Sequence, residues 1–182
     1  YVTRFMEGFH YDAQPMGVLV STVAALSTFF PEAANVHDPA VRRRQAIRLV
    51  AQVPTLACFA YRRRRGMPYS YPDTSLSYIG NFLSMMFKAT EQTYQPNPAI
   101  ERALDILFIL HADHGQACST TTMRCVGSAN SDPYCAAAAA AAALQGRFHD
   151  ESFQAVLSML KTIGEPSKVA GFIEEVKRND RK

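Results

Sequence analysis

Proline residues that follow a capping side chain divide this sequence into segments that favour helices. They occur as Asp38-Pro39, Asn97-Pro98 and Asp132-Pro133. An Asp or Asn at the N-cap accepts hydrogen bonds from the N–H groups of the first turn, and proline is favoured at the next position because it has no N–H to satisfy. Each pair therefore predicts the start of a helix. Pro15 and Pro54 predict two further starts.

After these starts, apolar side chains recur every three or four residues, which is the period of an amphipathic helix. No alternating strand pattern and no repeat of about 20–50 residues interrupts this period. We therefore predict an all-α fold. The expected helices cover residues 15–30, 39–51, 54–66, 76–87, 98–111, 133–143, 150–164 and 169–176.

The composition indicates a chain with a hydrophobic core and excludes several classes of protein. Of the 182 residues, 48% are apolar and 19% are charged, unlike the composition of disordered chains. The net charge of +3 is too small to indicate nucleic acid as a partner. The longest apolar runs end well before the roughly 20 residues that a membrane-spanning helix needs. We therefore predict a globular chain with no nucleic-acid partner and no membrane span.

The cysteines point to a reducing compartment. Cys58, Cys118, Cys125 and Cys135 form no C-x-x-C pair and do not combine with histidines at zinc-finger spacing. Their density is low for a disulfide framework. We therefore predict free thiols and no metal site.

Two segments have an unusual composition. The helix that begins at Pro133 carries almost only alanine. It is either closely packed, on several sides or at a subunit contact, or simply a strong helix former in a buried position, and the sequence favours neither interpretation. Arginines gather at residues 42–44, at Arg48 and at residues 62–65. A phosphate-rich partner would suit this cluster, but a solvated basic face is the favoured interpretation.

Three histidines are candidates for a functional site. His111 and His114 flank Asp113 and share a helix face, an arrangement suited to a metal or an anionic ligand. Taken alone, this pair favours hydrogen-bonded core histidines. His149 is placed near the start of a helix, where the helix dipole keeps the imidazole neutral. A neutral imidazole suits a proton donor or acceptor.

Motifs lie along the chain in a fixed order. Residues 11–19 contain Asp-Ala-Gln-Pro-Met, residues 76–83 read Leu-Ser-Tyr-Ile-Gly-Asn-Phe-Leu, and residues 104–114 end in His-Ala-Asp-His. In this order they resemble Asp-x-His-Pro-Met, Leu-Ser-Tyr-x-x-Asn-Phe-Leu and His-Ala-Asp-His of the citrate synthases. The resemblance continues in register through residues 118–120 and 127–134 and covers the whole chain, with Gln14 where the family usually has His.

The resemblance implies a fold and an activity. Citrate synthases are all-α homodimers with a large and a small domain, and they condense oxaloacetate with acetyl-CoA to citrate and CoA. By this comparison, residues 1–182 are a partial large domain, the helical core of the fold, incomplete at both ends and without the small domain. No cofactor is implied; acetyl-CoA enters only as a substrate.

The resemblance also implies roles for the histidines. His114 matches the residue that binds oxaloacetate or citrate, and His111 belongs to the same substrate-binding motif. His149 matches the residue that hydrogen-bonds the acetyl-CoA carbonyl as the enol forms. A later His and Asp of the family mechanism would follow Lys182.

The sequence departs from the family pattern near these histidines. Gly115 stands where the family has Glu, and Asp150 to Phe153 replace Gly-Gly-Ala-Asn. Added negative charge beside a developing enolate opposes its formation. The favoured hypothesis is therefore an inactive, structural or dimerising subunit of a larger assembly, with His149 as a relic. The alternatives are a fragment of an active citrate synthase and a methylcitrate synthase-like enzyme.

The resemblance also suggests partners and a compartment. In the family, dimers form through helices that match residues near 15–30, 133–147 and 150–162, so we expect a homo- or hetero-oligomer, or a larger complex, through these helices. We expect the mitochondrial matrix, with the peroxisome or a bacterial cytoplasm as alternatives.

Overall fold

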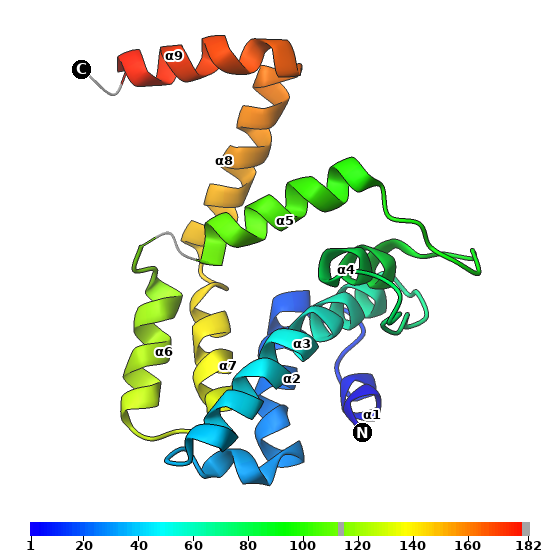
Figure 1. The fold of residues 1–182 in the computed structure, drawn as a ribbon, viewed down its shortest axis with the longest axis vertical. Helices are drawn as coiled ribbons and strands as arrows, with labels where there is room; N and C mark the ends of the chain where they lie inside the picture. Colours follow the sequence, from blue (N-terminus) through cyan, green and yellow to red (C-terminus); the bar gives the residue numbers. More distant parts are fainter. Residues whose placement is uncertain (113–114, 180–182) are drawn as a thin grey trace. The chain divides into compact units, whose positions relative to one another are not determined.

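The computed structural model describes residues 1–112 and 115–179, apart from the side chains of residues 147–151, 153 and 179. In this part of the chain the regular structure is entirely helical, which confirms the all-α fold class (Figure 1). The chain divides into two compact units, unit 1 over Tyr1–Leu144 and unit 2 over Gln145–Lys182. The assignment of residues 1–182 to one partial large domain stays a prediction.

Unit 1 carries most of the helices. In its described residues they are α1 (Val2–Glu7), α2 (Pro15–Phe29), the short 3-10 helix η1 (Pro31–Ala34), α3 (Pro39–Arg64), α4 (Tyr78–Phe87), α5 (Pro98–Ala112), α6 (Cys118–Ser128) and α7 (Pro133–Ala143). Unit 2 contains α8 (Arg147–Ile163), η2 (Pro166–Lys168) and α9 (Val169–Asn179). Among the described residues, no helix combines the length and the apolar composition that crossing a bilayer requires.

The predicted capping residues begin their helices. Each capping oxygen accepts the backbone N–H two residues later, at N···O distances of 2.8 Å for Asp38, 2.9 Å for Asn97 and 2.9 Å for Asp132. At the other end of a helix, Gly164 follows α8 with a φ of 69°, a conformation that glycine adopts without strain. Local sequence therefore sets these boundaries.

Two predicted helix boundaries are wrong. The helix expected from residue 150 begins three residues earlier, at Arg147. Residues 39–51 and 54–66 do not form two helices, because α3 continues through Pro54. A proline at this position cannot donate to the carbonyl of Val50, four residues earlier. The hydroxyl of Tyr78, at the start of α4, donates to this oxygen at 2.9 Å. A side chain from a different helix therefore supplies the hydrogen bond that the proline removes.

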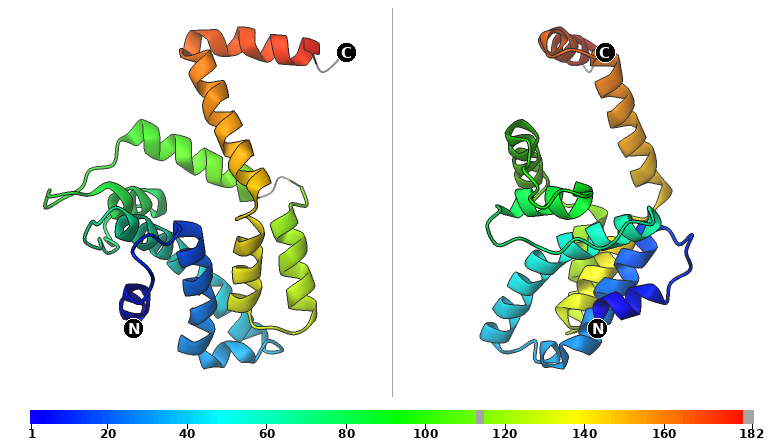
Figure 2. Two further views of the ribbon diagram at one scale, coloured as in Figure 1. Left: turned by 180° about the vertical axis from the view of Figure 1, so that it is seen from behind. Right: turned by 90° about the vertical axis from the view of Figure 1, so that its right-hand side faces the viewer.

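The apolar spacing does not predict α6, whose first turns read Cys-Ser-Thr-Thr-Thr. Ser and Thr are weak helix formers. α6 packs along α7, and α7 packs in turn against α2 and α3 (Figures 1 and 2). Ala136 and Ala138 of α7 are only 4% and 5% exposed. This packing accounts for α6, and it places α7 against several helices of unit 1. A subunit contact of α7 stays a prediction.

A polar network that runs from the core of unit 1 to its surface joins α3, α7 and η1. Tyr134 and Gln45 are fully buried, and the tyrosine hydroxyl donates to the amide oxygen at 2.6 Å. Arg48 donates to the same oxygen at 3.0 Å and to the carboxylate of Glu32 at 2.9 Å. The guanidinium of Arg48 also lies 3.9 Å from the ring centroid of Phe30. These hydrogen bonds fix the positions of α3, α7 and η1 relative to one another, although the three helices are distant in sequence.

Candidate functional site

His111 lies in the last turn of α5, with an exposed side chain. Its ring Nδ1 is 2.7 Å from the carbonyl oxygen of Leu107 in the preceding turn. Because a carbonyl oxygen only accepts, Nδ1 carries the proton in this hydrogen bond. The backbone of α5 therefore orients the ring, and Nε2 donates to a bound carboxylate only when the ring is in its imidazolium form.

The other two candidates are described less fully. His114 and Asp113 lie outside the described residues. The backbone of His149 lies in the first turn of α8, whose N-cap residue is Gly146, but its side chain also lies outside the described part. His111 belongs to unit 1 and His149 to unit 2. A site that brings these histidines together stays a prediction.

The segment after His114 begins with a backbone conformation that suits glycine. Gly115 has a φ of 93°, where a residue with a Cβ is strained. The Glu of the family pattern would therefore be strained in this conformation. Gln116 then donates to Thr121 at 3.5 Å, and α6 begins without a side-chain cap from Ala117. The uncapped first turn of α6 favours a negative charge at this end of the helix.

The Leu-Ser-Tyr motif has a structural role. The hydroxyl of Ser77 accepts the backbone N–H of Gly80 at 2.9 Å and bonds the carboxylate of Glu101. Asn81 donates to the carbonyl of Asp73 at 2.7 Å and accepts the N–H of the same residue at 2.6 Å. These bonds hold the loop before α4 and the start of α5 against α4.

The arginines near the end of α3 bind within the chain. Arg62 is only 2% exposed. Arg63 donates to the carbonyl of His10 at 3.0 Å, and Arg64 forms an ion pair with Asp12. The favoured interpretation as a solvated basic face is therefore wrong for Arg62, whereas Arg64 and Arg65 are exposed. Arg63 and Arg64 hold the segment before α2.

The thiols and the acidic groups form no metal centre in the part of the chain that the structure describes. All four cysteines are free. Cys58 is buried, and burial raises the pKa of its thiol to about 12, although the charge of Arg62 opposes this shift. Among the described residues, no three His, Cys, Asp or Glu side chains gather as metal ligands would.

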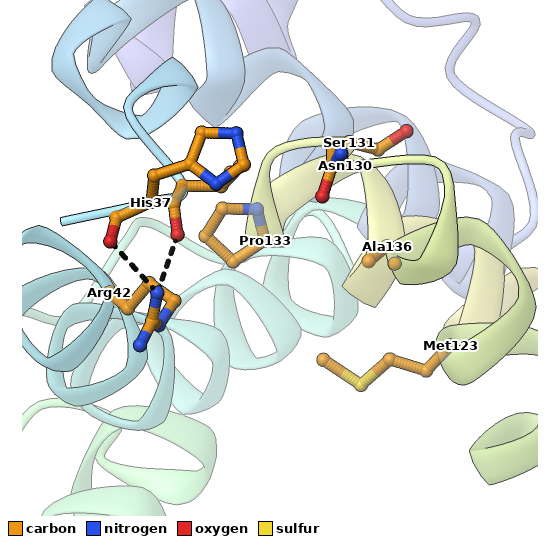
Figure 3. A pocket seen from close by; sticks show the side chains of 9 residues that line it. His37, Arg42, Met123, Asn130, Ser131, Pro133 and Ala136 are labelled. Atoms are coloured by element: carbon orange, nitrogen blue, oxygen red, sulfur yellow. Dashed lines mark hydrogen bonds between the residues drawn. The ribbon is translucent and has the colours of Figure 1, made fainter. Parts of the chain in front are cut away.

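Unit 1 contains a hollow that no sequence pattern predicts (Figure 3). Polar side chains at its edge come from His37, Arg42, Asn130 and Ser131. They belong to the segment before α3, to α3 itself and to the turn between α6 and α7. No motif or periodicity connects such separate segments, so the sequence alone carries no signal for this hollow.

Comparison with known proteins gives the same family for the whole chain. The family model described as "Citrate synthase, C-terminal domain" matches residues 1–182. The chain is 47% identical to the peroxisomal citrate synthase of Dictyostelium discoideum over 97% of its length. It is 45% identical to a second citrate synthase of that organism, again over 97% of its length. The chain spans 37% and 36% of these two relatives.

The fold of the chain is also similar to solved structures of citrate synthases. The crystal structure of citrate synthase from Pyrobaculum aerophilum superposes with a TM-score of 0.79 at 30% identity, covering 95% of this chain and 44% of that chain. The enzyme from Thermotoga maritima gives a TM-score of 0.66 at 25% identity, covering 99% of this chain and 45% of that chain.

Proposed function

The chain belongs to the citrate synthase family, and from this we propose that it is a segment of an enzyme that condenses acetyl-CoA with oxaloacetate to citrate and CoA. The observation that carries the proposal is the match of residues 1–182 to the family, with 47% identity to a citrate synthase over 97% of the chain.

The proposed roles follow the chemistry of the reaction. Loss of a proton from the thioester methyl group places negative charge on the carbonyl oxygen, and a hydrogen-bond donor at that oxygen stabilises it. We assign this donor to His149. His114 binds the oxaloacetate carboxylates together with His111, whose ring the Leu107 carbonyl orients. Acetyl-CoA is a substrate in this scheme, and no further cofactor is proposed.

Release of CoA tests the proposal directly. The natural full-length protein that contains this segment is incubated with acetyl-CoA and oxaloacetate, and free thiol is measured over time. We expect His149→Ala to lower kcat by roughly a hundredfold or more, as loss of a positioned proton donor does. His10→Ala changes a histidine that has no proposed role, so it serves as the control and keeps full activity.

A second candidate function is a subunit without catalytic activity. Asp150 and Glu151 favour it, because they replace glycines of the family pattern beside His149. If the full-length protein releases no CoA while it remains folded, the second candidate replaces the first. Release with propionyl-CoA in preference to acetyl-CoA would instead identify a methylcitrate synthase-like enzyme.

We also propose that the protein forms an oligomer through α2, α7 and α8, the helices that correspond to residues near 15–30, 133–147 and 150–162. Exposed apolar side chains on α8 support a contact surface there: Val156 is 48%, Leu157 58% and Leu160 55% exposed. An apolar stripe of this kind favours association. Light scattering after size-exclusion chromatography measures the mass, and a strictly monomeric protein would contradict the proposal.

The compartment is a proposal as well. The mitochondrial matrix remains our expectation, and the peroxisome is the alternative, since a relative of the chain is named a peroxisomal citrate synthase. Imaging of the tagged full-length protein beside markers of both organelles distinguishes them.

A further inference from the structure

We propose that unit 1 binds a small carboxylate with a short apolar tail in the hollow between the start of α3, the end of α6 and the start of α7 (Figure 3). The hollow has a volume of about 420 Å³. Small-molecule sites usually have volumes of roughly 300–1,000 Å³. Pro133 and Ala136 belong to α7, one of the helices proposed above for the oligomer contact, but none of the lining residues has a proposed role in the condensation, so the inference does not rest on that activity.

Arg42 supplies an oriented cation on one side of the hollow. One guanidinium nitrogen, Nη1, donates to the carbonyl oxygens of Val36 at 2.9 Å and of His37 at 3.2 Å (Figure 3). These two bonds occupy the hydrogens of Nη1 and hold the plane of the guanidinium. The donors on Nη2 and Nε remain in a set orientation, so little side-chain entropy is lost when a ligand binds them.

The charge of Arg42 has no acidic counterpart in the described part of the chain. Arg42 takes part in none of the ion pairs found there. The nearest acid in sequence, Asp38, accepts the N–H groups of Ala40 and Val41 at the N-cap of α3. Arg43 and Arg44 follow directly and add positive charge to the same end of the helix. The local potential therefore favours an anion.

Further polar groups line the hollow. His37, from the segment before α3, lies beside Arg42, and Asn130 and Ser131, from the turn between α6 and α7, lie on the far side of Pro133 (Figure 3). Asn130 has a φ of 58°, a left-handed conformation that is uncommon for a residue with a side chain. An imidazole, an amide and a hydroxyl therefore add hydrogen-bonding groups to the lining of the hollow.

The remaining wall is apolar and suits a hydrocarbon tail. Met123 of α6 and Ala136 of α7 lie across the hollow from Arg42, and Pro133 of α7 lies nearer to Arg42 (Figure 3). A methionine side chain adapts its shape to an apolar ligand. A planar carboxylate matches the fork of a single guanidinium better than a spherical anion does. The combination selects a monocarboxylate with a tail of a few methylene groups.

An NMR titration of the full chain tests the inference, with hexanoate, acetate and inorganic phosphate as probes. We expect saturable binding of hexanoate, with shifts in the amide signals of Gly127 and Ala136. Hexanoate should bind more tightly than acetate, since each buried methylene contributes up to about fourfold in affinity. Phosphate that binds as tightly as hexanoate, or the absence of saturable hexanoate binding, overturns the proposal.

Two variants test separately how the charge of Arg42 and the apolar wall contribute to binding. Arg42→Gln should weaken hexanoate and acetate binding by about tenfold or more. The control Arg43→Gln removes the same charge from a residue that does not line the hollow, and it should weaken both by less than about twofold. Met123→Gln should weaken hexanoate binding severalfold and leave acetate binding unchanged. Equal effects of the two arginine variants, or an equal loss for both ligands with Met123→Gln, contradict the proposal. Circular dichroism confirms that each variant is folded.

Discussion

At the scale of single residues, Arg62 is a buried cation whose partners are backbone carbonyls. Its Nη1 donates to the carbonyl of Lys88 at 2.8 Å and to that of Met85 at 3.3 Å, and its Nε bonds the carbonyl of Pro68. The last carbonyls of a helix carry the negative end of the helix dipole. The end of α4 therefore takes the place of the acidic partner that a buried arginine normally requires.

Removal of this guanidinium should destabilise unit 1. We expect Arg62→Met to lower the free energy of unfolding by about 3 kcal/mol, because several buried carbonyls lose a charged donor together. Urea denaturation measures the change. Arg65→Met is the matched control at the exposed end of the same arginine run, and its effect should stay within about 0.5 kcal/mol. Equal effects of the two variants would show that the carbonyl contacts contribute little.

The four thiols should react at different rates. Cys58 is buried with a pKa of about 12, so almost no thiolate forms near pH 8. Cys118 and Cys125 are exposed on α6. Cys135 is exposed too, but its pKa is raised, first by its hydrogen bond to Asp132 and then by burial. Only the thiolate is the nucleophile. Iodoacetamide labelling followed by mass spectrometry should modify Cys118 and Cys125 first, Cys135 later and Cys58 only after unfolding.

At the scale of the helices, α3 and α4 depend on one shared hydrogen bond. Pro54 leaves the carbonyl of Val50 without its helical donor, and the hydroxyl of Tyr78 donates to it at 2.9 Å. A kink or a break is the usual result of a proline inside a helix. Here the freed carbonyl is used to join α3 to the first residue of α4.

A double-mutant cycle measures this coupling. Tyr78→Phe should cost about 1 kcal/mol of unfolding free energy in the natural sequence, the usual net value of one hydrogen bond. In a Pro54→Ala background, the alanine introduces a backbone N–H that donates to the carbonyl of Val50, so Tyr78→Phe should cost less. Thermal denaturation of the four proteins gives the interaction energy. A cost of Tyr78→Phe that is the same in both backgrounds would refute the coupling.

The same helices show what a sequence can predict. The starts at Asp38, Asn97 and Asp132 depend on hydrogen bonds within two or three residues, so local reading finds them. The continuity of α3 depends on Tyr78, which is distant in sequence. The existence of α6 depends on packing against α7. Local helix propensity carries no information about either of these long-range contacts. For this reason the sequence did not predict the continuity of α3 or the existence of α6.

At the scale of the whole molecule, the family could be predicted from motifs, whereas the arrangement of the site could not. The Leu-Ser-Tyr motif indicated the family correctly, yet its described contacts hold α4 in place. The candidate site histidines lie in two separate units. A motif identifies the family, but its residues can have a role in packing as well as in catalysis. The motif alone therefore does not show which of its residues form the site.

The prediction for the whole molecule concerns its oligomeric state and the apolar face of α8. Leu157→Glu places a charge in that face and should shift the measured mass towards that of a single chain, 20.2 kDa for the present sequence. Ser158→Glu adds the same charge to the neighbouring residue, away from the apolar stripe, and should leave the oligomer intact. Light scattering over a range of protein concentrations distinguishes the two. A mass that neither variant changes would place the contact elsewhere.

The alanine helix has a consequence for protein engineering. Along α7, methyl groups separate the helix from its neighbours, and Ala136 and Ala138 leave almost no surface open. Larger side chains at such positions force backbones apart, at a typical cost of about 1–3 kcal/mol. Libraries that aim at heat resistance should therefore leave α7 unchanged and place their diversity on exposed helices, because variants at its buried alanines would be lost at the expression stage.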